Sequence, residues 1–251
     1  MIDAYAYGID ISEWNGDIDL TPYKDQFVII RAGYWTVEDK QYRNNVRKCQ
    51  ELNIPYGLYW FSESLTADSA DQEADAFLKA AAGTDPDLGL WLDMENSEYK
   101  TEHGFNAAKY AGPIAARICS RVQAAGYYAG VYCSKYWLKY VDPACAAFDH
   151  WIASWGSNNG QVNDDTRDLG TLLQYTSKLH GGSLDGDLCY VSLDHYDAGR
   201  KNDPVMDHAF LVKCLAYLTI AGLFGNDQAR VECLGSLYSE VQTEVNKLYE
   251  N

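Results

Sequence analysis

Hydrophobic and polar positions form two alternating patterns along the first three quarters of this chain. Short continuous apolar runs are typical of strands buried on both faces, and they are separated by segments whose apolar residues recur at helical spacing. The predicted strands cover residues 5–11, 26–32, 55–61, 88–92, 127–132, 151–154, 172–175 and 188–191. The predicted helices between them cover residues 39–52, 69–82 and 105–125.

This order of elements predicts an α/β domain with a mainly parallel sheet. Seven or eight strands within roughly the first 195 residues favour a closed or nearly closed (β/α) barrel. The segments between the later strands are too short for long helices, so we expect the barrel to be irregular.

The pattern changes at residues 197–204, a polar run with glycine and proline and no periodicity. After it, the chain shows three apolar stripes at helical spacing. We therefore predict a barrel over residues 1–199, a linker over 200–206 and a separate three-helix module over 207–251. The alternative is a helical extension packed on the barrel. The stripes are Phe210, Leu211, Cys214, Leu215 and Leu218, then Val231, Leu234 and Leu237, then Val241, Val245 and Leu248.

Charge excludes two classes of partner. The chain has 251 residues and a net charge of −16, from 20 basic residues against 36 acidic ones. Such a protein repels phosphate backbones and anionic lipid, so we expect neither nucleic acid nor a membrane as a partner. No apolar run reaches the length of a membrane-spanning helix, about 18 residues.

The cysteines and the N-terminus indicate where the chain is made. The seven cysteines lack paired spacing and the five histidines do not cluster, so neither a structural zinc site nor a disulfide framework is expected. The odd cysteine count fits a reducing cytosol. The first residues lack the basic start of a signal peptide. We expect synthesis in the cytoplasm without a signal peptide, so that action outside needs another component.

Two carboxylates follow the apolar run at residues 88–92. On a strand, Asp93 and Glu95 point the same way while Met94 points opposite, and their backbones lie about 6.6 Å apart. Two acids this close cannot ionise independently, which suits chemistry that needs one proton donor and one anion, such as glycoside hydrolysis. The alternative is that they cap a following helix.

Further acids lie at other strand ends. Asp10 ends the first predicted strand, and Asp185 and Asp187 lie just before the last one. The active site of such a barrel lies at the C-terminal ends of its strands, so three acidic strand ends favour catalysis over capping. The chain also holds 20 tyrosines and 7 tryptophans, and aromatic rings are common in sugar-binding grooves, although most of them must fill the core.

With these motifs in order, the chain resembles the family 25 glycoside hydrolases over roughly residues 5–195. That family cleaves the β-1,4 bond between N-acetylmuramic acid and N-acetylglucosamine in peptidoglycan, on an irregular (β/α) barrel and without a metal or organic cofactor. The matching segments are 8–12, 14–16, 18–19, 55–61, 92–95, 130–134, 151–153 and 173–177. Residues 31–35 depart from the family's pattern, which leaves the substrate contacts of that loop open.

The resemblance implies a role for each acid. Glu95 would be the general acid, and Asp93 either orients the substrate's acetamido group or acts as nucleophile. Asp10 would support this pair. The family's fourth acid falls in a compressed segment, where Asp187 is the first choice and Asp185 the alternative. The expected substrate-binding residues are Tyr59, Tyr132, Trp155 and Gln174, each of which would otherwise be ordinary core or rim.

The C-terminal segment resembles the three-helix cell-wall-binding repeat of certain pneumococcal-phage lysozymes. A single copy predicts weak binding unless the chain oligomerises, because avidity needs several linked sites. Together the two resemblances imply a peptidoglycan-cleaving endolysin or autolysin that reaches the wall after release through a holin or by lysis. The alternative is a catalytically silent wall-binding protein.

Overall fold

The computed structural model describes residues 4–142, 144–199, 208–220, 222 and 224–250. The predicted linker at 200–206 lies outside these residues, and so do the side chains of Phe210, Leu211 and Cys214. The strands are β1 (Ala6–Ile11), β2 (Phe27–Tyr34), β3 (Val37–Glu38), β4 (Tyr56–Phe61), β5 (Leu90–Asp93), β6 (Ala129–Ser134), β7 (Asp149–Ala153), β8 (Leu172–Leu179) and β9 (Leu184–Cys189).

Short and long helices connect these strands. The α-helices are α1 (Tyr42–Leu52), α2 (Ala67–Ala81), α3 (Glu98–Glu102), α4 (Ala107–Ala124), α5 (Leu138–Val141), α6 (His208–Ile220), α7 (Asp227–Leu234) and α8 (Tyr238–Glu250). The 3-10 helices are η1 (Glu13–Asn15), η2 (Thr21–Tyr23), η3 (Leu193–Gly199) and η4 (Gly235–Leu237). Thr66 begins α2 with a capping box, in which its side chain accepts the amide of Ser69.

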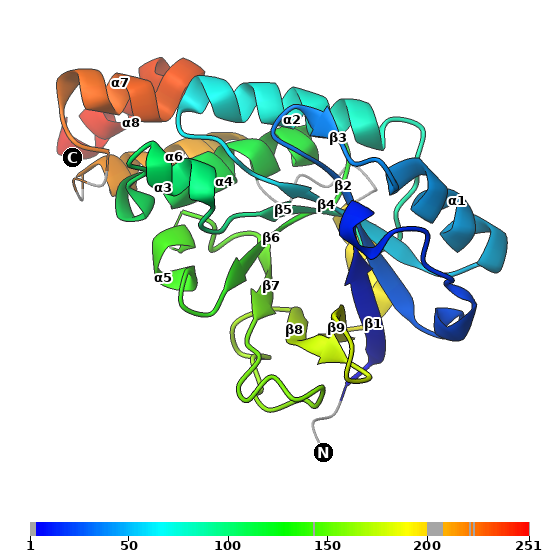
Figure 1. The fold of residues 1–251 in the computed structure, drawn as a ribbon. Coiled ribbons are helices and arrows are strands. Elements are labelled where there is room, and N and C mark those ends of the chain that lie inside the picture. Colours follow the sequence, from blue (N-terminus) through cyan, green and yellow to red (C-terminus); the bar gives the residue numbers. More distant parts are fainter. Residues whose placement is uncertain (1–3, 143, 200–207, 221, 223, 251) are drawn as a thin grey trace.

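The sheet closes into a barrel, as predicted (Figure 1). Its order is β1-β9-β8-β7-β6-β5-β4-β2, and β1 pairs with β2 in parallel to complete the ring, while β3 is an antiparallel addition to β2. Helices α1, α2 and α4 cover one side, whereas loops and the single turn α5 cover the side of β6 to β9. The prediction of an irregular (β/α) barrel is therefore confirmed.

The last strand differs from the prediction. It begins at Leu184 rather than residue 188 and runs antiparallel to both neighbours, β8 and β1. Only a short turn joins β8 to β9, and a parallel pairing would need a crossover of about a dozen residues. Asp185 and Asp187 therefore lie within β9, not in a loop before it.

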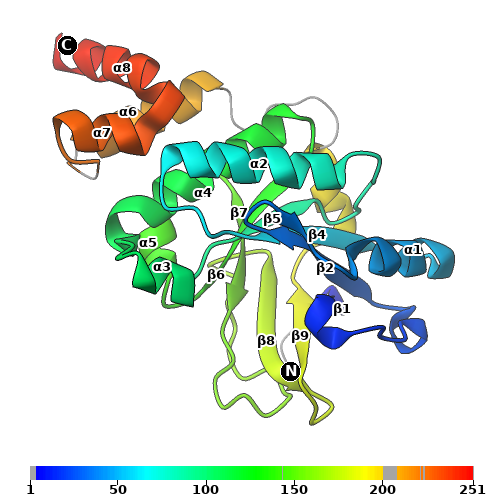
Figure 2. The same ribbon diagram turned by 45° about the horizontal axis from the view of Figure 1, so that its top comes forward.

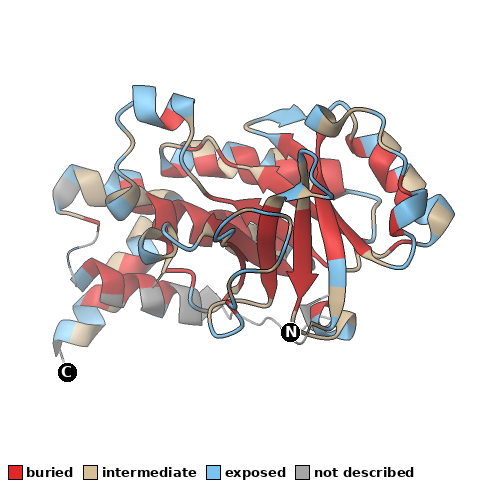
Figure 3. Ribbon diagram, turned by 60° about the horizontal axis from the view of Figure 1, so that its bottom comes forward, coloured by how far each residue is buried: buried red, intermediate tan, exposed pale blue. Residues whose placement is uncertain are grey.

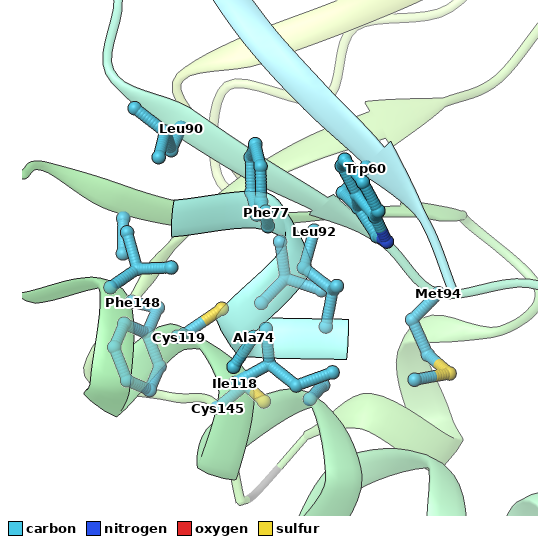
Figure 4. Packing of buried hydrophobic residues seen from close by; sticks show 14 of the residues in the cluster. Trp60, Ala74, Phe77, Leu90, Leu92, Met94, Ile118, Cys119, Cys145 and Phe148 are labelled. Carbon is cyan, nitrogen blue, oxygen red and sulfur yellow. The ribbon is translucent and has the colours of Figure 1, made fainter. Parts of the chain in front are cut away.

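Strand alternation divides the core into two layers. On β4, Trp60 points outward and stacks on Phe77 of α2 with ring centroids 5.4 Å apart, while Tyr59 points into the barrel. The outer layer between the strands and α2 and α4 is shown in Figure 4. Figure 3 shows most residues of the barrel strands as buried, whereas the helices also carry exposed and intermediate residues.

Aromatic rings fill the inside of the barrel. Trp91 and Trp151 lie edge to face with centroids 6.3 Å apart, and Tyr132 lies 4.6 Å from Trp151. Gly130 leaves room for the Trp91 ring, because a Cβ there would lie 2.3 Å from it. Much of the aromatic content therefore serves packing beneath the open end of the barrel.

Helices α6, α7 and α8 form the predicted small bundle, which lies beside α2 and α4 in both views (Figures 1 and 2). Its buried residues, Leu215 and Leu234 among them, belong to the same apolar cluster as the outer layer of the barrel. We expected helices that bury their apolar faces only against one another, whereas the structure also packs them against the barrel.

A buried arginine joins the two parts. Arg117 of α4 donates two hydrogen bonds to the Asp71 carboxylate of α2, at 2.8 and 2.6 Å. It also donates to the carbonyl oxygen of Leu234 at 2.9 Å and to the hydroxyl of Ser236 at 2.8 Å. One guanidinium thus ties two barrel helices to the end of α7 and the turn that follows it.

This contact predicts the effect of removing Arg117. Arg117→Ala should lower the free energy of unfolding by about 2–3 kcal/mol, because it leaves the buried carbonyl oxygen of Leu234 without its donor and the partly buried Asp71 carboxylate without this partner. Arg121→Ala is the matched control, since Arg121 pairs with the same Asp71 but its side chain is 35% exposed; its loss should stay below about 1 kcal/mol. Urea denaturation measures both. Equal losses would contradict a coupling role for Arg117.

Candidate active site

A cavity of about 460 Å³ opens at the C-terminal ends of the parallel strands. Seven of the eight residues predicted for the site line it, and Asp187 is the exception. Loops after β1 and β7 and the interior ends of the strands supply the walls. The lining residues are Asp10, Ser12, Trp14, Asn15, Arg31, Tyr59, Phe61, Asp93, Glu95, Tyr132, Trp151, Trp155, Gln174, Ser183 and Asp185.

Asp93 and Glu95 both face this cavity, and Met94 between them is fully buried on the other side of the strand. Asp93 is the last residue of β5 and lies between Phe61 of β4 and Tyr132 of β6. Burial raises the pKa of Asp93 well above its ordinary value, and the charge of Glu95 adds to this. Burial also raises the pKa of Glu95. The pair therefore retains a proton at a pH where free carboxyls have lost theirs.

A chain of hydrogen bonds crosses the floor of the cavity. Gln174 of β8 donates from Nε2 to the Asp10 carboxylate at 2.8 Å. Its Oε1 accepts from the Tyr132 hydroxyl and from Trp155 Nε1, both at 3.0 Å. Because both ends of the amide are engaged, the direction of Gln174 is fixed. Four of the predicted residues thus form one network that orients Asp10.

The two acids of β9 lie at different depths. Asp185 pairs with Asp10 across the β1–β9 ladder and lines the cavity, and burial raises its pKa to about 8. Asp187 is fully buried two residues further along the same face, and Trp151 Nε1 donates to it at 2.8 Å. Burial raises the pKa of Asp187 well above its ordinary value, and the charge of Asp10 adds to this, so the protonated form of Asp187 is favoured beside Asp10.

These depths distinguish the two candidates for the family's fourth acid, a role that stays a prediction for either residue. Asp187, the first choice for the fourth acid, supports Asp10 from below, whereas Asp185, the alternative, reaches the cavity. An antiparallel strand enters the barrel at its open end, so the earlier acid of β9 is the shallower one. The sequence-based choice assumed a strand that begins after both acids.

Sequence analysis missed the cationic side of the cavity. Arg31 of β2 lines it and is held by Asp39 at 2.8 Å from Nε and by Glu13 at 3.1 Å from Nη2. A single arginine inside the apolar run of residues 27–32 was the available signal, because an isolated charge in a buried strand needs a partner. Trp14, whose ring is 83% exposed, also lines the cavity.

No group of three or more histidine, cysteine or acidic side chains among the described residues has an arrangement that could hold a metal ion. The six cysteines that the structure describes are buried free thiols. Within the described part of the chain, no helix combines the length and the apolar character needed to cross a membrane.

Family models match both parts of the chain. The model described as glycosyl hydrolases family 25 matches residues 9–183, and the CW_7 repeat matches residues 214–249. A curated relative, "Probable GH family 25 lysozyme 4" of Dictyostelium discoideum, is 25% identical over 162 residues, which are 61% of this chain and 73% of that protein.

Solved structures share the fold. The modular autolysin LytC of Streptococcus pneumoniae, in complex with a synthetic peptidoglycan ligand, matches with a TM-score of 0.63 and 24% identity over 74% of this chain and 46% of that one. This chain therefore spans about half the length of that autolysin. The catalytic domain of endolysin ply40, from bacteriophage P40 of Listeria monocytogenes, matches with a TM-score of 0.60 and 23% identity over 78% and 97%.

The cavity's electrostatics predict how Glu95 responds to Asp10. After burial, which raises the pKa of Glu95, the negative charge of Asp10 raises it further. Asp10→Asn removes that charge, so the pKa of Glu95 should fall. Titration of the side-chain carboxyls by 13C NMR measures it, with Asp165→Asn on an exposed loop as control. A Glu95 pKa unchanged in Asp10→Asn would show that the two groups are not coupled.

Proposed function

Because the chain belongs to the family 25 glycosyl hydrolases, we propose that it hydrolyses bacterial peptidoglycan at the β-1,4 bond between N-acetylmuramic acid and N-acetylglucosamine. The observation that carries this proposal is the carboxyl pair of buried Asp93 and half-buried Glu95 at the open end of the barrel. Glycoside hydrolysis uses two carboxyl groups in this way, one as acid and one as anion.

In the proposed reaction, Glu95 donates a proton to the leaving glycosidic oxygen. The charge of Glu95 raises the pKa of Asp93, so the two carboxyls do not ionise independently and one of them holds the proton. We assign it to Glu95 during the reaction, because Glu95 lies beyond the end of β5 and is the more exposed of the two, whereas Asp93 is 6% exposed. The deeper Asp93 stabilises the developing positive charge, either by orienting the acetamido group or as nucleophile.

Asp10 then holds negative charge beside the pair. Gln174 donates to Asp10 at 2.8 Å, which fixes the Asp10 carboxylate in place. Trp14 and Trp155 are exposed at the cavity, where flat rings can stack on sugar faces. Buried Tyr59 and Tyr132 form the inner wall below them.

The C-terminal helices complete the proposed function by holding the enzyme on its substrate. The CW_7 repeat match and the small bundle support wall binding by this part of the chain. We propose that the protein acts as an endolysin or autolysin, made in the cytoplasm and released to the wall through a holin or by lysis. Two relatives, an autolysin and an endolysin, bear names of this kind.

Digestion of purified cell wall tests the reaction. Glu95→Gln should lower the rate by at least about a hundredfold, because it removes the proton donor. Glu102→Gln, an exposed acid on α3, is the control and should keep full activity. Reducing-end analysis should reveal new N-acetylmuramic acid ends. New N-acetylglucosamine ends, or free amino groups, would contradict the proposed bond, and a wild type that clears no wall would favour a silent wall-binding protein.

Truncation after Gly199 separates the two roles. The shortened chain keeps every cavity residue and the Arg117–Asp71 pair, so it should still cleave small soluble muropeptide oligomers. Its retention on sedimented intact wall should fall, and its lysis of whole cells with it. Circular dichroism shows whether the barrel remains folded. Undiminished wall retention would contradict the assignment of wall binding to the helices.

A further inference from the structure

A lysine lies fully buried behind the carboxyl pair. Lys100 belongs to the single-turn helix α3, whose N-cap, Ser97, accepts the amide of Lys100 at 3.1 Å. This turn points the side chain inward, so that its Nζ lies 5.6 Å from the centre of the Phe61 ring and 5.9 Å from that of Phe105. The proposed reaction assigns this residue no part.

Its ammonium group joins the two loops that carry the cavity wall. Nζ donates to the carbonyl oxygen of Ser62, directly after β4. It also donates at 2.7 Å to the carbonyl oxygen of Glu95, just after β5. Both bonds go to the main chain, so the position of the Glu95 backbone is fixed while its carboxyl remains available to the cavity.

Acids surround this ammonium on each element packed against it. Asp93 and Glu95 face it from the end of β5, Glu63 from the loop after β4, and Glu73 from α2. Ser62 and the Glu63 amide both donate to Glu73 at 2.6 Å, and burial raises the pKa of Glu73 to about 7. Two of the four acids around the Lys100 ammonium, Asp93 and Glu95, therefore belong to the candidate active site.

Burial of an ammonium group costs several kcal/mol unless its charge is compensated. A neutral side chain of similar length would fill the same space at a smaller cost, so the two carbonyl contacts alone do not account for a lysine here. Burial lowers the pKa of Lys100, and the charges of the surrounding acids raise it in return. The charge of Lys100 in turn lowers the pKa of Asp93 and of Glu95.

We propose that Lys100 is a positioning residue of the active site, which ties the ends of β4 and β5 together and supplies the positive charge that lets the Asp93–Glu95 pair carry one negative charge in a buried place. The proposal rests on the proposed function for the reaction that this charge serves. The electrostatic part of the proposal, the effect of the Lys100 charge on Asp93 and Glu95, does not depend on the reaction and applies to the protein without substrate.

The sign of the effect follows from the charges. After burial, which raises the pKa of Asp93 and Glu95, Lys100 lowers the pKa of both. Without the ammonium both pKa values rise. The carboxylate that must be ionised then forms only at higher pH, and the carboxyl that must be protonated keeps its proton to higher pH. Both limbs of the pH–activity profile should therefore move to higher pH.

Three variants test this. Lys100→Met removes the charge at similar length, Lys100→Arg retains a charge, and Lys79→Met removes an exposed lysine of α2 as control. In Lys100→Met, kcat should fall about tenfold or more at the wild-type optimum through misplacement of Glu95, and the profile should move to higher pH. Lys100→Arg should return the profile toward that of the wild type, and Lys79→Met should match the wild type. An unmoved profile in Lys100→Met, with kcat lost equally in Lys100→Arg, would overturn the proposal in favour of a purely structural lysine.

NMR gives a readout that needs no activity. The 13C titration of Asp93 and Glu95 should move to higher pH in Lys100→Met, even if wild-type digestion releases no N-acetylmuramic acid ends and the proposed function fails. A second measurement uses the wild type and does not require the variant to fold. Over the pH range in which Asp93 and Glu95 titrate, the 15N chemical shift of Lys100 Nζ should be that of an ammonium group. The shift of a neutral amine over this pH range would overturn the proposal.

Discussion

The mutual repulsion of acids gathered in a buried place is the constraint on which the rest of this structure depends. Asp10, Asp93, Glu95, Asp185 and Asp187 come from three strands that meet at one end of the barrel. Each has a raised pKa, chiefly because burial disfavours the charged form. The surroundings are arranged to hold a limited number of charges there: Gln174 and Trp151 donate hydrogen bonds, and Lys100 lies beneath. The aromatic interior below the acids excludes water and strengthens all of these interactions.

The fold could be predicted from the sequence because its strands are continuous apolar runs. A short apolar run such as residues 88–92 is typical of a strand that is covered on both faces. Repetition of such strands with helices between them predicts a barrel. The direction of β9 could not be predicted in the same way. Its interior face carries Asp185 and Asp187, so the hydrophobic signal begins only at Leu188, although the strand begins at Leu184. Because these acidic residues interrupt the apolar pattern, the pattern did not predict where their strand begins.

The site was predictable where it depends on local spacing and not where it depends on distant partners. Asp93 and Glu95 share a face because alternation along a strand is a property of the backbone. Gln174 and Asp10 are 164 positions apart, and only a resemblance to known relatives could bring them together. Lys100 shows the remaining difficulty, since a lysine in a charged segment is ordinarily exposed, and here the Ser97 cap turns it inward. Arg117 is similar, because its partners come from two distant segments, Asp71 from α2 and Leu234 and Ser236 from the end of α7 and the turn after it.

Under the proposed function, the position of the C-terminal helices determines where a single CW_7 repeat would hold the wall. A repeat on a flexible tether searches a volume set by the length of its linker, and its help to the enzyme falls as that volume grows. Here Arg117 and the shared apolar cluster hold α7 against α2 and α4, on the outside of the barrel. If the helices bind the wall as proposed, a bound wall strand stands at a set distance from the cavity rather than at a range of distances. In the proposed function, this fixed placement would raise the local concentration of bonds within reach of Glu95.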